Sequence, residues 1–186
     1  MVDLKSGANP LFLREEELRR GIELMFYAYR EFTSEPDRIL EEIGFGRAHH
    51  RAIYFVGRYP GITISELLVI LRITKQSLSR VLSQLLERGY VEQTRGKRDQ
   101  RQRLLSLTES GRALETRLTD TQRRRFAAAY RSAGAEAVAG FTAVLAGIMD
   151  PKDLERVDRL RARADEEAGE QDKADGRAGL AAKTGR

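Results

Sequence analysis

The sequence predicts a mostly α-helical protein with one small β-hairpin, and three observations lead to this fold class. Apolar residues recur at helical spacing along most of residues 11–164. Residues 63–88 have the start signals of two helices separated by a tight turn. Two short strands joined by a polar stretch follow within residues 91–107. A helix, a turn, a helix and a hairpin in this order form a winged helix-turn-helix.

The first helix of this unit begins at a capping box. Thr63 and Glu66 have the spacing at which two side chains satisfy backbone N–H groups at a helix start, and the apolar residues 67–71 follow at once. Residues 72–74 then predict a tight turn. Thr74 is the expected N-cap of a second helix that runs to about Arg88.

This second helix has one apolar face and one polar face. Its apolar stripe, at positions i, i+3, i+4, i+7 and i+8, consists of Leu78, Val81, Leu82, Leu85 and Leu86. The polar face carries Gln76, Arg80 and Ser83, flanked by Ser77 and Ser79, with Lys75 at the helix start. Arginine can read guanine, glutamine can read adenine, and hydroxyl groups reach bases or phosphates. Taken alone, the helix fits an ordinary amphipathic helix with a solvated polar face equally well.

The hairpin that follows favours a DNA-binding helix over an ordinary amphipathic one, because it adds to a concentration of positive charge. Gly89 suits the left-handed position that ends a helix, and strands are expected over residues 91–95 and 103–107 with a basic tip between them. Residues 72–103 contain nine basic and three acidic side chains, a net charge of +6 against +5 for the whole chain. Such a concentration indicates a surface that meets phosphate groups.

Several ordered motifs in this region resemble the MarR family of bacterial transcription regulators. They are Leu78-Ser79-Arg80-Val81, Leu85, Gly89-Tyr90-Val91, Asp99-x-Arg101 and Leu105-x-Leu107-Thr108-x-x-Gly111. The resemblance covers about residues 44–112. It implies a homodimer that binds pseudo-palindromic operator DNA and thereby blocks or recruits polymerase. At Gln93 the sequence departs from the family, many members of which have arginine after Gly-x-Val, so Arg95 is the candidate for that phosphate contact.

The resemblance and the residue chemistry together give a set of candidate DNA contacts. In the recognition helix they are Thr74, Lys75, Gln76, Ser77, Ser79, Arg80 and Ser83. In the wing they are Arg95, Lys97, Arg98, Asp99, Arg101 and Arg103. By resemblance, Gln76, Ser77, Ser79 and Arg80 face the major groove, Arg101 enters the minor groove, and Asp99 holds the wing by pairing with an arginine. Lys75 and the remaining wing cations are expected to supply sequence-independent phosphate affinity.

The flanking segments are predicted as follows. Residues 1–10 are expected to be mobile, and residues 11–43 to form an N-terminal dimerisation region whose helix breaks at Ser34-Glu35-Pro36-Asp37. The winged domain occupies residues 44–108 and includes a preceding helix over residues 47–59. Residues 109–164 form C-terminal dimerisation helices, interrupted at Gly134 and restarted at Asp150-Pro151. The composition of residues 165–186 predicts a disordered tail.

Composition and motifs also argue against several kinds of site and several classes of protein. The chain has no cysteine, which excludes disulfides and thiolate metal sites, and its two histidines, His49 and His50, are adjacent on a helix and cannot easily share a metal. No catalytic motif or cofactor signature is present, so we expect no enzyme. No apolar run is long enough to span a bilayer, and no signal sequence is evident, so a cytoplasmic protein is expected.

Two questions stay open on the sequence alone. By resemblance, Met25, Phe26, Tyr29, His50 and Tyr54 are candidates for contacting a small aromatic or anionic ligand, although ordinary core packing explains the same spacing. The basic region also suits two alternative functions: a winged helix that docks a protein partner, or a nucleoid-type protein that binds DNA without sequence preference. A steep fall in DNA affinity with salt would argue against the protein-docking module. Equal affinity for random and operator DNA would identify the nucleoid-type protein.

Overall fold

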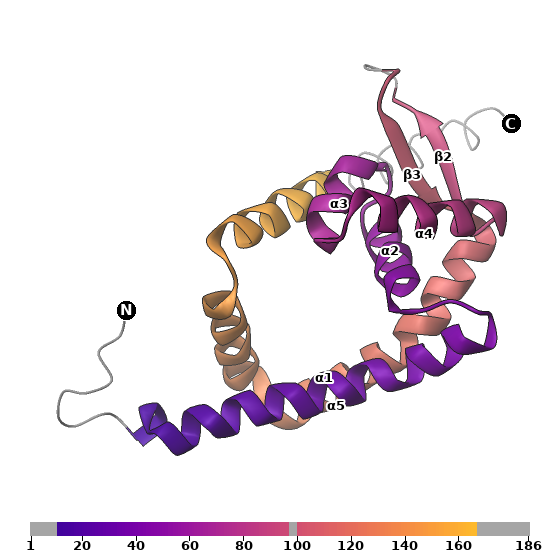
Figure 1. Cartoon of the computed structure of the whole chain (residues 1–186). Coiled ribbons are helices and arrows are strands. Elements are labelled where there is room, and N and C mark those ends of the chain that lie inside the picture. The colour runs from indigo at the N-terminus through magenta and orange to yellow at the C-terminus, as the bar shows by residue number, and fades with distance from the viewer. Residues whose placement is uncertain (1–10, 97–99, 167–186) are drawn as a thin grey trace, which may run out of the picture. The chain divides into compact units, whose positions relative to one another are not determined.

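A computed structural model describes residues 11–96 and 100–166 and confirms the predicted fold class. The chain is mostly helical with a small antiparallel sheet (Figure 1). It divides into two compact units, Met1–Gly46 and Arg47–Arg186. Over the described ranges, no helix is both long and apolar enough to cross a membrane.

The first unit is dominated by one long helix, which corrects the sequence prediction. A short 3-10 turn, Leu11–Leu13, precedes α1, Glu15–Glu42, and α1 continues straight through Pro36. The predicted break at residues 34–37 is therefore wrong. Burial explains the continuity: Pro36, Ile39 and Leu40 share one buried stripe. Burying two such aliphatic side chains contributes about 1.5–3 kcal/mol each, which offsets the roughly 3 kcal/mol cost of an interior proline.

The second unit begins with the helix-turn-helix. Helix α2, Arg47–Arg58, leads through the two-residue strand β1, Ile62–Thr63, into α3, Ile64–Leu71, and then α4, Lys75–Glu87. The predicted capping box is present, because the Thr63 side chain accepts from the Glu66 backbone N–H while the Glu66 carboxylate accepts from the Thr63 N–H. The core of this lobe is aliphatic. Its fully buried side chains include Ile53, Val56, Ile62, Leu67, Leu78, Leu85 and Leu105.

The wing is a hairpin of β2, Val91–Arg95, and β3, Arg103–Leu107, with the strand boundaries that the sequence predicts. The sheet nevertheless has three strands in the order β1-β3-β2, because Ile62 pairs with Leu105 and the N–H of Gly61 donates to the Leu105 carbonyl at 2.9 Å. Strand β1 was not predicted, since two residues are too few to show alternation. It fastens the base of the wing to the start of α3.

The C-terminal part consists of helices. Helix α5, Glu109–Ile148, has non-helical backbone at Gly134 (φ 82°), as its sequence predicts, and bends there. A further helix covers residues 151–166, with Asp150 accepting from the Lys152 N–H at 2.9 Å as its N-cap. Asp165 and Glu166, placed in the tail by the sequence, belong to this helix; the predicted mobile residues 1–10 and the rest of the tail lie outside the described residues.

Candidate nucleic-acid interface

The recognition helix α4 starts at a well-formed N-cap. The Thr74 hydroxyl accepts from the Ser77 backbone N–H at 3.1 Å and donates to the Ser77 hydroxyl at 2.8 Å. Substituting such an N-cap residue by alanine costs about 0.5–2 kcal/mol. The cap therefore fixes where α4 begins, and with it the position of the helix end that carries Lys75 and Gln76.

The two faces of α4 separate as the sequence predicts. Of the five predicted stripe residues, Leu86 is half-buried and the other four are buried: Leu78, Val81, Leu82 and Leu85, the last at 0% exposure. The predicted contact residues of this helix are all exposed: Thr74, Lys75, Gln76, Ser77, Ser79, Arg80 and Ser83. The exposed face thus carries two cations, one amide and several hydroxyl groups, which are the side-chain types that read base edges and bind phosphates.

A polar contact between two side chains joins α2 to α4. The His49 Nε2 atom lies 2.7 Å from the Gln84 Oε1 atom, across a part-buried gap between the two helices. An amide oxygen only accepts hydrogen bonds, so the imidazole is the donor if the amide is oriented as here. Sequence analysis missed this pair because neither residue belongs to a motif and the two lie 35 positions apart.

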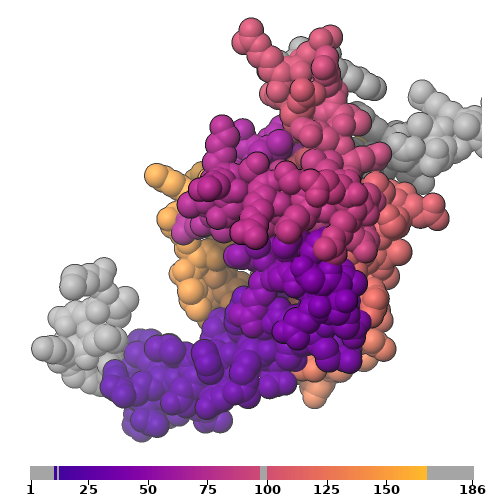
Figure 2. All heavy atoms as spheres, turned by 45° about the vertical axis from the view of Figure 1, so that its right-hand side comes forward, coloured from indigo at the N-terminus to yellow at the C-terminus, as the bar shows by residue number. Residues whose placement is uncertain are grey.

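The wing carries further exposed cations. Arg95 and Arg103 are cross-strand partners in the β2–β3 ladder, and both are exposed, as is Arg101. The ladder closes with the Gly96 N–H donating to the Gln102 carbonyl at 3.1 Å. Figure 2 shows the hairpin projecting from the rest of its unit. The candidate residues Lys97, Arg98 and Asp99 lie outside the described residues.

The end of α4 is tied to the start of α5 beneath the wing. The hydroxyl groups of Thr108 and Ser110 both donate to the Gly89 carbonyl, at 2.6 and 2.8 Å. Gly89 has the left-handed backbone (φ 68°) expected from its place after the helix. Gly111 passes so close to Tyr90 that a Cβ atom would lie 1.9 Å from its carbonyl oxygen. The Leu-Thr-x-x-Gly motif therefore has a structural role, because it joins the recognition helix, the wing and α5.

The candidate ligand contacts are distributed over both units. On α1, Met25, Phe26 and Tyr29 are exposed, so core packing within one chain does not account for their spacing. On α2, His50 is buried and Tyr54 is 39% exposed. Among the described residues, no group of three or more histidine, aspartate or glutamate side chains could hold a metal ion.

Comparisons with known proteins agree with this architecture. The profile of the MarR family matches residues 43–102. A mutant MarR from E. coli, solved in complex with operator DNA, superimposes with a TM-score of 0.53 at 20% identity, over 76% of this chain and 100% of that one. A SlyA-like transcription regulator from Listeria monocytogenes gives 0.54 at 21% identity, over 77% of this chain and 92% of that one. At such identities the likeness shows the fold.

A protein similar in sequence supports the assignment to a family, and not only to a fold. The HTH-type transcriptional regulator PetP of Rhodobacter capsulatus is 56% identical over 145 residues, which span 78% of this chain and 87% of PetP. The aligned length exceeds the helix-turn-helix, so the similarity includes flanking helices as well. The chain therefore belongs to the MarR family of transcriptional regulators.

Proposed function

We propose that this regulator binds a pseudo-palindromic operator in double-stranded DNA as a homodimer and acts by occupying the promoter rather than by catalysis. The single observation that carries the proposal is the exposed polar face of α4 beside a basic wing, on a helix whose apolar face packs mainly within its own lobe. Two such helices, one from each subunit, would reach successive major grooves about one helical turn apart.

The side chains divide between two roles. Gln76, Ser79 and Arg80 stand on the exposed face of α4 and have the donors and acceptors to discriminate base pairs. Arg101, near the end of the hairpin, is the candidate for the minor groove, where width and A·T content are read. Lys75, Arg95 and Arg103 are exposed cations suited to phosphates. Lys97 and Arg98, which lie outside the described residues, are proposed to add to this phosphate affinity.

Dimerisation is supported by apolar surface that one chain leaves uncovered. On α1, Ile22 and Phe26 are 71% and 63% exposed, and on the second half of α5, Val144 and Ile148 are 61% and 70% exposed. Exposed apolar stripes of this kind mark interaction surfaces. A second copy of the chain is the proposed partner, because a two-fold symmetric DNA site requires two equivalent lobes.

We further propose that a small aromatic or anionic ligand modulates DNA binding through Met25, Phe26, Tyr29, His50 and Tyr54. The support is chemical: exposed rings can stack on an aromatic ligand, and a histidine can donate to an anion. A ligand that favours one separation of the two recognition helices would change how well they match the two half-sites.

Selection of the purified protein against random double-stranded DNA at near-physiological salt tests the main proposal. We expect a pseudo-palindrome with half-sites about one helical turn apart. DNA binding without an enriched motif would favour a nucleoid-type protein instead. The absence of DNA binding over a range of low salt concentrations would favour a protein-docking module, because phosphate contacts strengthen steeply as salt falls.

A further inference from the structure

The helix of residues 151–166 lies against α3 of its own chain. The Arg72 guanidinium, at the C-terminal end of α3, contacts the Asp153 carboxylate at 2.6 Å, and the Glu66 carboxylate, in the first turn of α3, contacts Arg163 at 2.8 Å. The start of one helix therefore meets the end of the other, and the two run antiparallel. Figure 1 shows the end of the orange-yellow C-terminal segment reaching α3.

The contact follows one stripe of the C-terminal helix. Asp153, Arg156, Leu160 and Arg163 are spaced at three or four residues, and they are half-buried or buried, with Leu160 at 7% exposure. Tyr59, just after α2, also interacts electrostatically with Arg161 and Asp165; burial raises the pKa of this tyrosine, with smaller contributions from neighbouring charges. Leu160 is therefore buried between the two ion pairs that join this helix to α3.

Arg72 has a backbone conformation that arginine seldom adopts. It is the C-cap of α3 with φ 49° and ψ 42°, the only non-glycine residue with positive φ in the part of the chain described here. Glycine would adopt this conformation without strain, but glycine has no side chain for an ion pair. Backbone strain at a residue whose side chain makes a specific contact indicates that the contact has a functional role.

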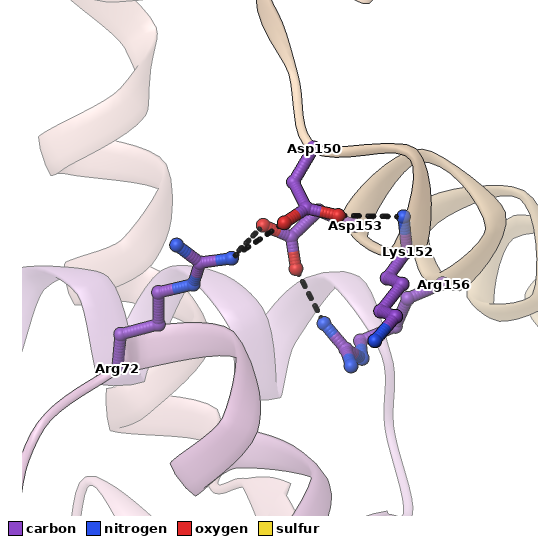
Figure 3. A network of polar contacts seen from close by, with 5 residues as sticks. All are labelled: Arg72, Asp150, Lys152, Asp153 and Arg156. Carbon is purple, nitrogen blue, oxygen red and sulfur yellow. Dashed lines mark hydrogen bonds and ion pairs between the residues drawn. The ribbon is translucent and has the colours of Figure 1, made fainter.

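The ion pairs form a small network at this point. Asp153 lies between Arg72 and Arg156 and contacts both, while Asp150 lies 4.0 Å from Arg72 (Figure 3). Arg72 is two residues before Thr74, the N-cap of α4. On the other side, Asp150 is two residues after Ile148, in the exposed apolar half of α5. The network therefore connects the start of the recognition helix to the end of α5.

We propose that Arg72 and Asp153 are a positioning pair that closes a clasp between the helix of residues 151–166 and the turn before α4, and that the closed clasp holds α4 in the orientation that binds DNA. The role of the clasp in orienting α4 for DNA binding rests on the proposed function, whereas the existence of the clasp does not. The pair is partly exposed, at 66% and 29% for the two side chains. Such a pair is weak by itself, so the clasp is poised to open when the C-terminal helices move.

Hydrogen exchange of residues 151–166 tests the clasp without DNA. Arg72→Ala keeps the left-handed strain and removes the charge, Arg72→Lys keeps both, and Arg72→Gly removes both. We expect faster exchange in the alanine and glycine variants and near-normal exchange in the lysine variant. Unchanged exchange in the alanine and glycine variants would overturn the clasp. Equally fast exchange in the lysine variant would show that charge is not what closes it, with the same consequence.

A double-mutant cycle with Asp153→Ala shows whether the pair acts as a unit. If the pair closes the clasp, the double variant should exchange no faster than the faster of the two single variants, because both changes remove the contact between Arg72 and Asp153. Glu155→Ala is the matched control, since it removes one exposed carboxylate from the same helix. Additive effects, or the same effect in the control, would contradict a specific pair.

Affinity for the selected operator separates positioning from a direct phosphate contact by Arg72. We expect Arg72→Ala and Asp153→Ala to weaken binding by a similar factor of about 5 or more, and Arg72→Lys to restore most of it. If Arg72 bound a phosphate directly, Asp153→Ala would free its charge and leave affinity unchanged or higher, which would overturn the positioning role. A wild-type protein that selects no DNA would overturn the proposed function and this role together, while hydrogen exchange alone decides whether the clasp exists.

Discussion

Helices α4 and α1 have the same kind of amphipathic pattern but use it differently. In α4 the apolar stripe is buried inside its lobe, and the polar face is free for other molecules. In α1 the stripe through Ile22, Met25, Phe26 and Tyr29 is exposed over most of its length. Only its last turns, with Ile39 and Leu40, are buried. A single chain therefore buries most of the apolar stripe of α4 but leaves most of the apolar stripe of α1 exposed.

This difference indicates what each helix is for. A helix that buries its apolar face locally can offer polar side chains in a fixed arrangement, as DNA recognition requires. A helix with an uncovered apolar stripe needs a partner surface to remove that stripe from water. The two helices thus suggest a division between DNA contact and subunit contact, and each can be tested separately.

The largest effect is expected from Phe26→Asp on α1. A carboxylate in the proposed subunit interface would be buried without a partner, so we expect the dimer to dissociate into subunits of 21.1 kDa. Operator affinity should then fall by about 100-fold or more, because the second half-site no longer gains from a linked subunit. Sedimentation velocity measures the first effect and a binding titration the second.

Arg20→Asp is the control for this change, since it places the same carboxylate on the opposite, exposed face of α1. It should leave the oligomeric state unchanged. A Phe26→Asp protein that still sediments as a dimer would show that the exposed stripe of α1 does not hold the subunits together.

Leu85→Ala should have the next largest effect, on the stability of the α4 lobe. Leu85 is fully buried, and truncating a buried leucine costs about 2–5 kcal/mol through lost transfer free energy and the remaining cavity. Chemical denaturation measures this change. Ser83→Ala, on the exposed side of the same helix, should shift the free energy of unfolding by about 0.5 kcal/mol or less. Equal effects of the two changes would contradict the assignment of the two faces.

Arg80→Ala should have a smaller and more selective effect. Arg80 lies on the exposed face of α4, and the loss of one bidentate base contact relaxes discrimination by about 1–3 kcal/mol at one position in each half-site. Repeating the DNA selection with the variant would reveal the relaxed position. Lys75→Ala should instead weaken all sequences alike and reduce the salt slope by about one unit. A base preference identical to wild type would argue against Arg80 as a reading residue.

The winged lobe could be predicted closely because its signals are local. Thr63 with Glu66, Thr74 and Gly89 each mark an element boundary by a contact within a few residues, and the structure contains each of these caps or turns. The exposed face of α4 follows from helical geometry in the same way. The side-chain roles on DNA remain predictions.

What the sequence could not supply depends on distant packing. Helix α1 continues through Pro36 because of burial that propensity does not show, and β1 is visible only through its pairing with Leu105. The contacts of His49 with Gln84 and of Arg72 with Asp153 join residues 35 and 81 positions apart, without any motif. Such pairs are chosen by the assembled fold, so a single sequence gives no sign of them.

The smallest effect is expected at Glu66, where the contact between α3 and the C-terminal helix is polar. Burial acts to raise the pKa of Glu66, but hydrogen bonds from Thr63 and the charge of Arg163 outweigh it, so the pKa lies below its ordinary value of 4.5. A carboxyl group whose folded-state pKa is lowered stabilises the folded state above its unfolded pKa. That stabilisation is lost as pH falls through the folded-state value.

Glu66→Gln should therefore be less stable than wild type at pH 7, with the difference vanishing as the pH falls below about 4.5. Glutamine retains the capping-box geometry, so the comparison isolates the charge. Because both side chains of the pair are about one-third exposed, solvent screening limits the difference to about 1 kcal/mol or less. Urea denaturation between pH 7 and pH 3 measures it. A difference that grew toward acid pH would reverse the assigned direction of the pKa shift, and with it the view that Arg163 and Thr63 stabilise the Glu66 carboxylate.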